Sequence, residues 1–352
     1  MQFIKQEHGK FDKNKYSEFI LAGDIGGTSI SLGIFGIKKN ISELIVSFKF
    51  KSSEVKILPD AINQVLDSAE KTDSIKISKA CFGAAGIVSQ DKQHAKIKKL
   101  SWNLSSDDIS EKTKLKKIIF INDFEAVGYG ICIIKNNQLI KIKRGIKIPK
   151  SNILAIGAGT GLGKTLLVYD EHKKAYIPIA SEAGHINFPA QTREEFKLAE
   201  FIKKRKKIKC GVSYEQVLSG KGLSNIYLFL RKSRKFANTK YTKEIDASSC
   251  SPELISKYRK ADRTCKKTFE IFTCNYAKFA RDMAIDGLST GGIYIAGGIA
   301  PKNAEIFGKQ FIKIFEQSHE RAYILKMMPI YLITDYNIGL LGAGFAGAEL
   351  LK

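Results

Sequence analysis

The sequence has little of what membrane, secreted or zinc-dependent proteins require. No apolar run approaches the ~20 residues of a membrane helix. The segment before Phe19 carries charges but has neither an apolar core nor a small-residue cleavage site, so a secretory signal is not expected. The six cysteines are far apart and form no Cys-x-x-Cys pair, which fits neither a zinc ribbon nor a disulfide framework. We therefore expect a cytoplasmic protein with reduced thiols.

Acidic residues are scarce relative to basic ones. The chain has 58 lysines and arginines against 35 acidic residues, a net charge of +23. A positive field of this kind attracts nucleic acids and membrane surfaces. However, the lysines are spread along the chain, and the densest clusters, at 141–147 and 203–209, lack the interleaved aromatic residues that stack on bases. We interpret the excess charge as solvated surface and expect neither a nucleic-acid nor a membrane partner.

The hydrophobic pattern predicts a mixed α/β architecture. A hydrophobic content of 44% over 352 residues is enough for one large domain or two ordinary ones. Strand-like runs alternate with helical patterns, the strands at 117–121 and 292–296 and the helices at 59–69, 196–206 and 266–287. The segment 231–260 is rich in Lys, Ser, Thr and Arg without apolar periodicity, which predicts a surface loop or a weakly packed helix.

Two stretches share one layout, an apolar strand that runs into a glycine-rich turn and then into another apolar strand. The first is FILAGDIGGTSISLGIF, from Phe19. Glycines let the backbone approach an anion, so several N–H groups can converge on a phosphate, and Thr28 adds a hydroxyl. Asp24 stands where a Mg²⁺ ion could take an oxygen ligand through water. A plain β-turn is the alternative, because Gly-Gly is an ordinary hairpin signal. The candidate nucleotide-binding residues are Gly23, Asp24, Ile25, Gly26, Gly27 and Thr28.

The second stretch, NILAIGAGTGLGKTLLVYD, also satisfies a relaxed Walker A pattern that ends in Lys164 and Thr165. A true P-loop opens a helix, whereas Thr165 is followed by the β-like run Leu-Leu-Val-Tyr-Asp. We therefore favour a phosphate-binding β-hairpin in which Lys164 is incidental. Its nucleotide contacts would be Gly159, Thr160 and Gly161.

Between the hairpins, Phe120-Ile-Asn-Asp-Phe-Glu-Ala reads as a strand that ends in a polar pair and then starts a helix. Asp123 could serve as the helix N-cap. Alternatively it could be a general base that takes the proton of a sugar hydroxyl, with Asn122 holding the sugar. The residues alone do not decide between these roles.

Further polar residues could bind a polyol. A sugar site needs several converging donors and acceptors, because a buried polar group without a partner costs about 1 to 3 kcal/mol. Glu182, His185 and Glu215 are candidates, although single loop carboxylates are usually only solvated. Near the end of the chain, Gly297 and Gly298 form either a tight turn or a flat platform for an adenine ring.

Taken in this order, the segments resemble the bacterial-type glucokinases of the hexokinase and actin superfamily. The resemblance rests on GDIGGT, INDFEA, GAGTGLG, SEAGH, YEQVLSGKGL and AGGIAPKN, and it extends from about Phe19 to the C-terminus. The sequence departs from the family where Ile87 replaces a proline and where Lys98-Lys99 replaces the Thr-Asn pair shortly before the family's tryptophan, here Trp102.

The resemblance implies a two-lobed, actin-like (ribonuclease H-like) fold with mixed sheets flanked by helices. It implies a polar arm at 1–17, a small α/β lobe at 18–133 completed by the C-terminal helix at 335–352, and a large α/β lobe at 134–334. It also implies ATP-dependent phosphorylation of glucose to glucose 6-phosphate, the first step of glycolysis, with ATP and Mg²⁺ as cofactors. Asp123 would be the base, and the sugar would be bound by Asn122, Glu182, His185 and Glu215.

Several alternatives remain open at this point. The acceptor could be mannose, glucosamine or fructose, and Lys98-Lys99 is compatible with a catalytically impaired protein that binds ATP or sugar. The related ROK kinases add a zinc-binding cysteine cluster, whereas here only Cys210 lies within ~50 residues after His185. A ROK repressor would need a helix-turn-helix before the first hairpin, where the arm is too short. A homodimer is the default expectation for a soluble enzyme.

Overall fold

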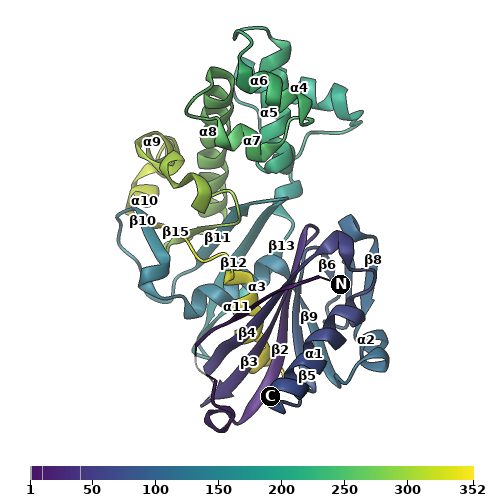
Figure 1. The fold of residues 1–352 in the computed structure, drawn as a ribbon. Coiled ribbons are helices and arrows are strands. Elements are labelled where there is room, and N and C mark those ends of the chain that lie inside the picture. Colours follow the sequence, from purple (N-terminus) through teal and green to yellow (C-terminus); the bar gives the residue numbers. More distant parts are fainter. Residues whose placement is uncertain (1, 10, 40) are drawn as a thin grey trace. The chain divides into compact units, whose positions relative to one another are not determined.

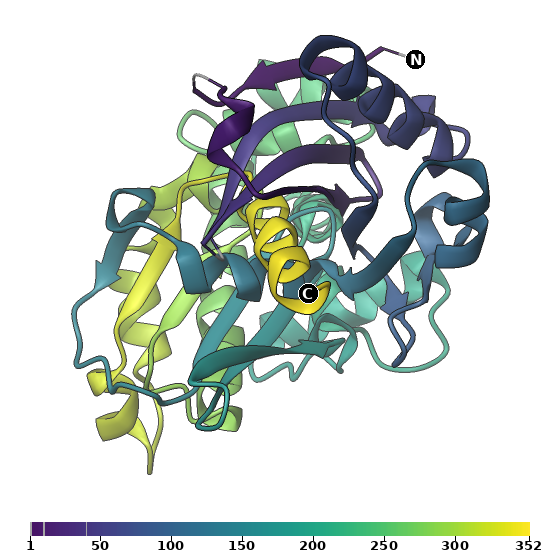
Figure 2. The ribbon, with the colours of Figure 1, turned by 90° about the horizontal axis from the view of Figure 1, so that it is seen from below.

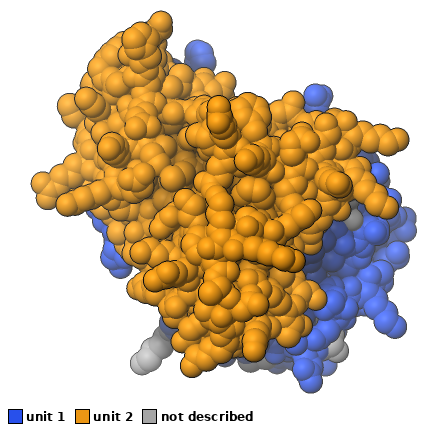
Figure 3. Space-filling model, turned by 90° about the horizontal axis from the view of Figure 1, so that it is seen from above, with its two compact units in different colours: residues 1–138, 170–180, 335–352 blue, residues 139–169, 181–334 orange. Residues whose placement is uncertain are grey.

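The computed structural model describes residues 2–9, 11–39 and 41–352, and Figure 1 shows its fold. The chain divides into two compact units (Figure 3). Unit 1 comprises residues 1–138, 170–180 and 335–352, and unit 2 comprises residues 139–169 and 181–334. Unit 1 therefore contains the first glycine hairpin together with the C-terminal segment.

Unit 1 is built on a six-stranded sheet with the order β1-β4-β3-β2-β5-β9. The strands β1 to β4 pair antiparallel, whereas β2, β5 and β9 run parallel to one another. The bounds are β1 (Ile4–Glu7), β2 (Glu18–Ile25), β3 (Ser29–Lys38), β4 (Ile41–Lys51), β5 (Lys79–Ala84) and β9 (Lys117–Asn122). A small antiparallel sheet follows β5 in the chain and consists of β6 (Ile87–Val88), β7 (His94–Ile97) and β8 (Trp102–Ser105).

Helices cover both faces of the large sheet in unit 1. Side chains alternate along β2, so Leu21 enters one core while Ile20 and Ala22 enter the other. The first core includes residues of α1 (Leu58–Asp73) and α2 (Ser106–Lys112), and the second includes residues of α3 (Asp123–Ile133) and α11 (Ile338–Leu350). Figure 2 shows α11, in yellow, lying against the strands.

The helices α3 and α11 approach each other closely through glycines. A Cβ atom at Gly342 would overlap the carbonyl oxygen of Ala126, and one at Gly130 would lie 2.5 Å from the carbonyl oxygen of Ile338. Both glycines are buried. The small residues of the terminal helix are therefore a packing requirement.

The segment expected to be a polar arm contains β1, which pairs with β4 at the edge of the sheet. All four side chains of β1 are exposed, so the strand has no buried face that the hydrophobic pattern could reveal. Met1 and Lys10 of this arm lie outside the described residues.

The second six-stranded sheet has the order β10-β15-β14-β11-β12-β13. Its strands are β10 (Leu139–Lys143), β11 (Ile153–Ala158), β12 (Leu162–Asp170), β13 (Ala175–Ser181), β14 (Ile293–Ala296) and β15 (Ile330–Ile333). The helices of unit 2 are α4 (Arg193–Lys206), α5 (Gly220–Lys232), α6 (Lys240–Ala247), α7 (Pro252–Lys257), α8 (Arg263–Asp286), α9 (Lys309–Phe315) and α10 (Ala322–Met327). One large core joins β11, β14 and β15 to α5 and α8.

The predicted strands at 117–121 and 292–296 correspond to β9 and β14, and the three predicted helices correspond to α1, α4 and α8. For 231–260 the helix alternative is confirmed, whereas the loop alternative and the weak packing are wrong. This segment contains α6 and α7, each with an N-cap side chain, and it buries Ile245 and Ile255 completely. At 8 and 6 residues, these helices are too short to show an apolar period.

The contact between α3 and α11 can be tested by the substitution Gly342→Ala. The added methyl group has no space beside Ala126, so we expect the free energy of unfolding of the ligand-free protein to fall by about 2 to 3 kcal/mol in denaturant titration. Glu349→Ala, at an exposed position of the same helix, should change it by less than about 0.5 kcal/mol. Equal effects of the two substitutions would contradict the packing requirement.

Candidate active site

The first glycine stretch forms the predicted hairpin of β2 and β3. The N–H of Gly26 donates to the carbonyl of Ser29 at 3.0 Å and closes the turn. Ser52 fixes the tip from outside, because its hydroxyl donates to the carbonyl of Gly26 at 2.7 Å and its N–H donates to the carbonyl of Thr28 at 3.1 Å. The tip is therefore held in one conformation.

Asp24 lies on β2 just before this tip and is partly buried. Burial raises the pKa of its carboxyl group to about 6, and the positive charge of Lys49 acts in the opposite direction. A nearby cation stabilises the ionised form of a carboxylate that has lost part of its hydration. Within the described residues, no group of three or more His, Cys, Asp or Glu side chains could hold a metal. A single carboxylate suits Mg²⁺, which keeps several waters and shares its shell with phosphates.

Asn122, and not Asp123, caps helix α3. The side-chain oxygen of Asn122 accepts from the N–H of Phe124 at 2.9 Å and from that of Glu125 at 3.3 Å, and the Glu125 carboxylate accepts from the Asn122 N–H in return. The interpretation of Asp123 as the N-cap is therefore wrong. Asparagine and aspartate cap equally well, so the sequence could not distinguish two adjacent candidates. Asp123 is the first residue of the helix and is partly exposed.

Two residues that the sequence analysis missed support this cap. Lys92 forms an ion pair of 2.7 Å with Glu125, whose side chain is buried. The amide nitrogen of Asn122 donates to the carbonyl of Gly86 at 3.1 Å. Because Lys92 lies in a turn far from Glu125 in the sequence, no local pattern reveals the pair.

The parallel strands of unit 1 bring the first hairpin and Asp123 to one edge of the sheet. Ile25 on β2 is opposite Ala84 on β5, and Ala84 is opposite Asn122 on β9. Strands are spaced about 4.8 Å apart, so the start of the hairpin tip and Asn122 are separated by roughly 10 Å. A carboxylate and a glycine-rich turn at this separation are close enough to act on one substrate pair.

The second glycine stretch also forms a hairpin, from β11 and β12, and the P-loop interpretation is wrong. Lys164 lies within β12, opposite Ile156, and its ammonium group donates to the Asp286 carboxylate at 2.8 Å. Thr165 is completely buried in the same strand. No helix follows these residues, so the lysine is not presented to a phosphate in the manner of a P-loop.

The tip of the second hairpin contacts two segments that are distant in the sequence. The carbonyl of Gly159 accepts from the N–H of Gly220, at the start of α5, at 2.8 Å. The carbonyl of Ala158 accepts from Ile299 at 3.2 Å. Gly297 has a φ of +85°, and a Cβ atom there would lie 2.6 Å from the Ala158 oxygen, so only glycine fits. Unit 2 thus places the two predicted nucleotide-binding turns side by side.

Two predicted sugar-binding segments also lie against this hairpin. The carboxylate of Glu215 accepts from the N–H of Leu162 at 3.1 Å, and a Cβ atom at Gly161 would lie 2.6 Å from the same carboxylate. Gly184 packs so tightly on the carbonyl of Leu162 that a side chain there would overlap it. On either side of Gly184, Glu182 and His185 approach each other to 3.6 Å, and both side chains are more than half exposed.

A buried tyrosine that the sequence analysis missed positions the second hairpin. The hydroxyl oxygen of Tyr276, on α8, accepts from the N–H of Ala158 at 3.2 Å. Burial raises the pKa of Tyr276 above its usual range, so the phenol is neutral. In the sequence this tyrosine is one apolar position among many on a helix.

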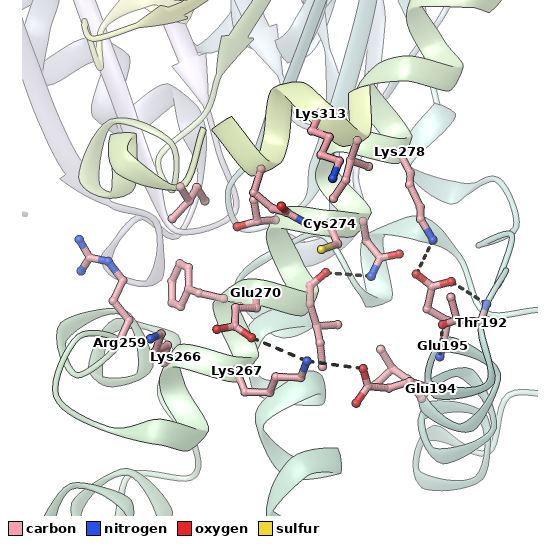
Figure 4. A pocket seen from close by; sticks show the side chains of 18 of the residues that line it. Thr192, Glu194, Glu195, Arg259, Lys266, Lys267, Glu270, Cys274, Lys278 and Lys313 are labelled. Carbon is pink, nitrogen blue, oxygen red and sulfur yellow. Dashed lines mark hydrogen bonds and ion pairs between the residues drawn. The ribbon is translucent and has the colours of Figure 1, made fainter. Parts of the chain in front are cut away.

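A cavity of about 1140 Å³ lies elsewhere in unit 2, lined by residues of α4, α8 and α9 (Figure 4). None of the predicted site residues lines it. Several of its charged side chains pair with one another, as in the contact of 2.6 Å between Lys278 and Glu195. Lys267 likewise lies between Glu194 and Glu270. Because none of the predicted site residues lines the cavity and several of its charges are used in ion pairs, we assign it no part in the site.

Comparisons with known proteins identify the class. A solved glucokinase from an Antarctic psychrotroph matches 94% of this chain and 99% of its own length, at 26% identity and a TM-score of 0.74. Glucokinase from Balamuthia mandrillaris, in complex with glucose, is 20% identical with a TM-score of 0.77 over 94% of this chain and 93% of its own. A ROK family glucokinase from Streptomyces griseus, in complex with glucose and AMPPNP, is 17% identical with a TM-score of 0.66 over 94% and 99%. The predicted hexokinase and actin-like fold class is thus confirmed, and the chain is a sugar kinase of that class.

The particular family follows from the sequence relatives. The model of the Glucokinase family matches residues 21–350. The glucokinase of a Nostoc species is 33% identical over 347 residues, which cover 94% of this chain and 99% of that protein. The glucokinase of a Synechocystis species is 29% identical over 350 residues, 94% and 98% of the two chains. The chain belongs to the glucokinase family. In the part of the chain that the structure describes, none of the helices has the length and apolar character needed to cross a membrane.

The raised pKa of Asp24 predicts that this residue lowers the free energy of unfolding of the ligand-free protein at high pH. The carboxyl pKa is about 6 in the folded protein, against 3.8 for an unperturbed aspartate, so this group stabilises the fold less as the pH rises from 4 through 6. Asp24→Asn should therefore raise the free energy of unfolding at pH 8 by up to about 3 kcal/mol, and by clearly less at pH 4.5. Denaturant titrations without Mg²⁺ at both pH values measure this, with exposed Asp67→Asn as the control. An equal gain at both pH values would contradict the role of burial.

The position of Lys164 predicts that its charge is dispensable for nucleotide binding. Lys164→Met removes the ion pair with Asp286, which is largely exposed, so we expect the Kd for MgATP to change by less than about threefold. Calorimetric titration of the variant and the unmodified protein gives both constants. Loss of nucleotide binding in the variant would restore the P-loop interpretation.

Proposed function

We propose that the protein transfers the γ-phosphoryl group of ATP to the 6-hydroxyl of glucose. The observation that carries the proposal is the edge of the unit 1 sheet, where β2 leads into the tip Gly26–Thr28 and β9, separated from β2 only by β5, leads into Asp123. A phosphoryl transfer needs both elements, a base at the attacking oxygen and N–H donors at the phosphates.

In the proposed reaction, the carboxylate of Asp123 takes the proton of the sugar hydroxyl as its oxygen attacks the γ-phosphorus. The bond between that phosphorus and the bridging oxygen of ADP breaks, and ADP leaves with the electron pair. Asp123 suits this role because it begins α3 and is partly exposed, while Asn122 provides the cap in its place.

The sugar would be held by Asn122, Glu182, His185 and Glu215. The amide nitrogen of Asn122 carries two N–H groups, one of which is used by Gly86, so the other can donate to a hydroxyl. Glu182 and His185 offer an acceptor and a group that can donate or accept within 3.6 Å of each other. Alternating donors and acceptors match the hydroxyls of a polyol.

ATP would be bound through both glycine hairpins and the Gly297–Gly298 turn. In unit 2, Gly159–Gly161 lies beside that turn and beside the N-terminus of α5, where N–H groups and the helix dipole favour negative charge. Mg²⁺, when bound near Asp24 through water, would neutralise charge on the β- and γ-phosphates. Glycines at these positions allow the close approach that a phosphate requires.

The base assignment is tested by Asp123→Asn. Loss of the general base should lower kcat for sugar-dependent ADP release by about 10² to 10⁴-fold, with little change in the KM for MgATP. Asp107→Asn, at an exposed position of α2, should retain the original rate. Turnover of Asp123→Asn within a few-fold of the unmodified protein would refute the assignment.

The same assay across glucose, mannose, glucosamine and fructose names the acceptor. Because these sugars differ at one or two hydroxyls, a site that pairs each hydroxyl should favour one of them by kcat/KM. Binding of ATP without stimulation by any of these sugars would instead favour a non-catalytic protein that binds ATP or sugar.

A further inference from the structure

Lys99 lies across the tip of the first hairpin. Its ammonium group donates to the hydroxyl oxygen of Thr28 at 2.8 Å. Its aliphatic stem packs on Gly27, where a Cβ atom would overlap the Lys99 side chain. A positive charge is therefore placed directly at the turn that presents Gly26–Thr28.

The backbone that leads to Lys99 starts beside Asn122. The carbonyl of Lys96 lies so close to Gly86 that no side chain fits there, and the carbonyl of Gly86 accepts from the Asn122 side chain. From Lys96 the chain continues to Lys99, whose side chain reaches Thr28. Within unit 1, the segment from Lys96 to Lys99 thus runs from the residues that contact Asn122, next to the proposed base, to the proposed phosphate-binding turn. The side chain of Lys98 lies outside the described residues, so the inference concerns Lys99 alone.

We propose that Lys99 is a further catalytic residue that contacts the γ-phosphoryl group while it is transferred. The proposal rests on the proposed function, in which the tip Gly26–Thr28 holds the phosphates. During transfer, negative charge is spread over three phosphoryl oxygens, and a fixed ammonium group stabilises it. In this role Lys99 acts only through its charge and its hydrogen bonds, and forms no covalent bond with the substrates.

The position favours the γ-phosphoryl group over the sugar as the partner. A sugar hydroxyl would gain one neutral hydrogen bond from the ammonium group, whereas a phosphoryl oxygen forms a charge-assisted bond that is roughly twice as strong. The stem on Gly27 and the bond to Thr28 hold the charge toward the hairpin. Removing the ammonium group is therefore expected to lower kcat more than it raises the KM for the sugar.

The test compares Lys99→Met, which keeps the stem, with Lys99→Arg, which keeps the charge. Steady-state kinetics with glucose and MgATP should show kcat of Lys99→Met reduced about 100-fold, with the KM for glucose within about threefold of the original. Lys99→Arg should recover at least a tenth of the original kcat. Lys96→Met, an exposed lysine of the preceding strand β7, is the matched control and should leave kcat unchanged. Thermal unfolding of each variant reports whether the fold is intact.

A binding measurement separates a phosphate contact from a structural support. Loss of a contact to the γ-phosphate should weaken the binding of a non-hydrolysable ATP analogue by about tenfold or more while leaving ADP binding unaffected, because only the analogue has the γ-phosphate that accepts the charge-assisted hydrogen bond. Equal weakening of both nucleotides, or of neither, would overturn the proposal.

Two kinetic outcomes would also overturn it: kcat of Lys99→Met within threefold of the original, or a raised KM for glucose at unchanged kcat. The proposed function fails separately, if no sugar stimulates ADP release or if Asp123→Asn remains active. In that case the difference between the ATP analogue and ADP still reports on the phosphate contact of Lys99.

Discussion

Parallel strand pairing beside a glycine hairpin is the constraint on which both units depend. In unit 1, β2 enters the hairpin while it pairs in parallel with β5, and in unit 2, β11 does the same with β14. Parallel strands end at a common edge of the sheet, so each hairpin tip lies at the same edge as the residues at the ends of the parallel strands. In unit 1 these residues include Asn122 at the end of β9, two strands from β2, and Asp123 after it. In unit 2 they include the Gly297–Gly298 turn after β14, the direct neighbour of β11.

Glycine at these positions is required by close backbone approach, whether or not a phosphate is bound. Gly184 and Gly297 each contact a carbonyl of the second hairpin at distances that leave no space for a side chain. Because the hairpin is confined in this way, the N–H groups of its tip would already be oriented when the proposed nucleotide binds. Such preorganisation lowers the free energy needed to reorganise the site during the reaction.

Much of this arrangement could be predicted from the sequence. Both hairpins, the strand before Asn122 and the three long helices follow from apolar patterns and turn residues, and they agree with the structure. Long-range pairings could not be predicted, because nothing local links Lys92 to Glu125 or Tyr276 to Ala158. The cap of α3 was missed for a different reason, since Asn122 and Asp123 are adjacent and both are good capping residues. Lys99 was visible as a departure from the family pattern, but only the structure shows that it reaches Thr28.

The position of α11 has a consequence for the order in which the protein is made. Residues 338–350 cover the face of β2 that carries Ile20 and Ala22. Because β2 is synthesised early and this helix last, the face of β2 cannot be buried until synthesis is nearly complete. Until that helix leaves the ribosome, one face of the first sheet remains apolar and open to association. Unit 2, whose core does not involve this helix, can fold in the interval. A chain that ends before residue 338 would therefore combine a folded unit 2 with a unit 1 sheet whose apolar face is exposed. Chaperones and proteases recognise exposed apolar surface of this kind.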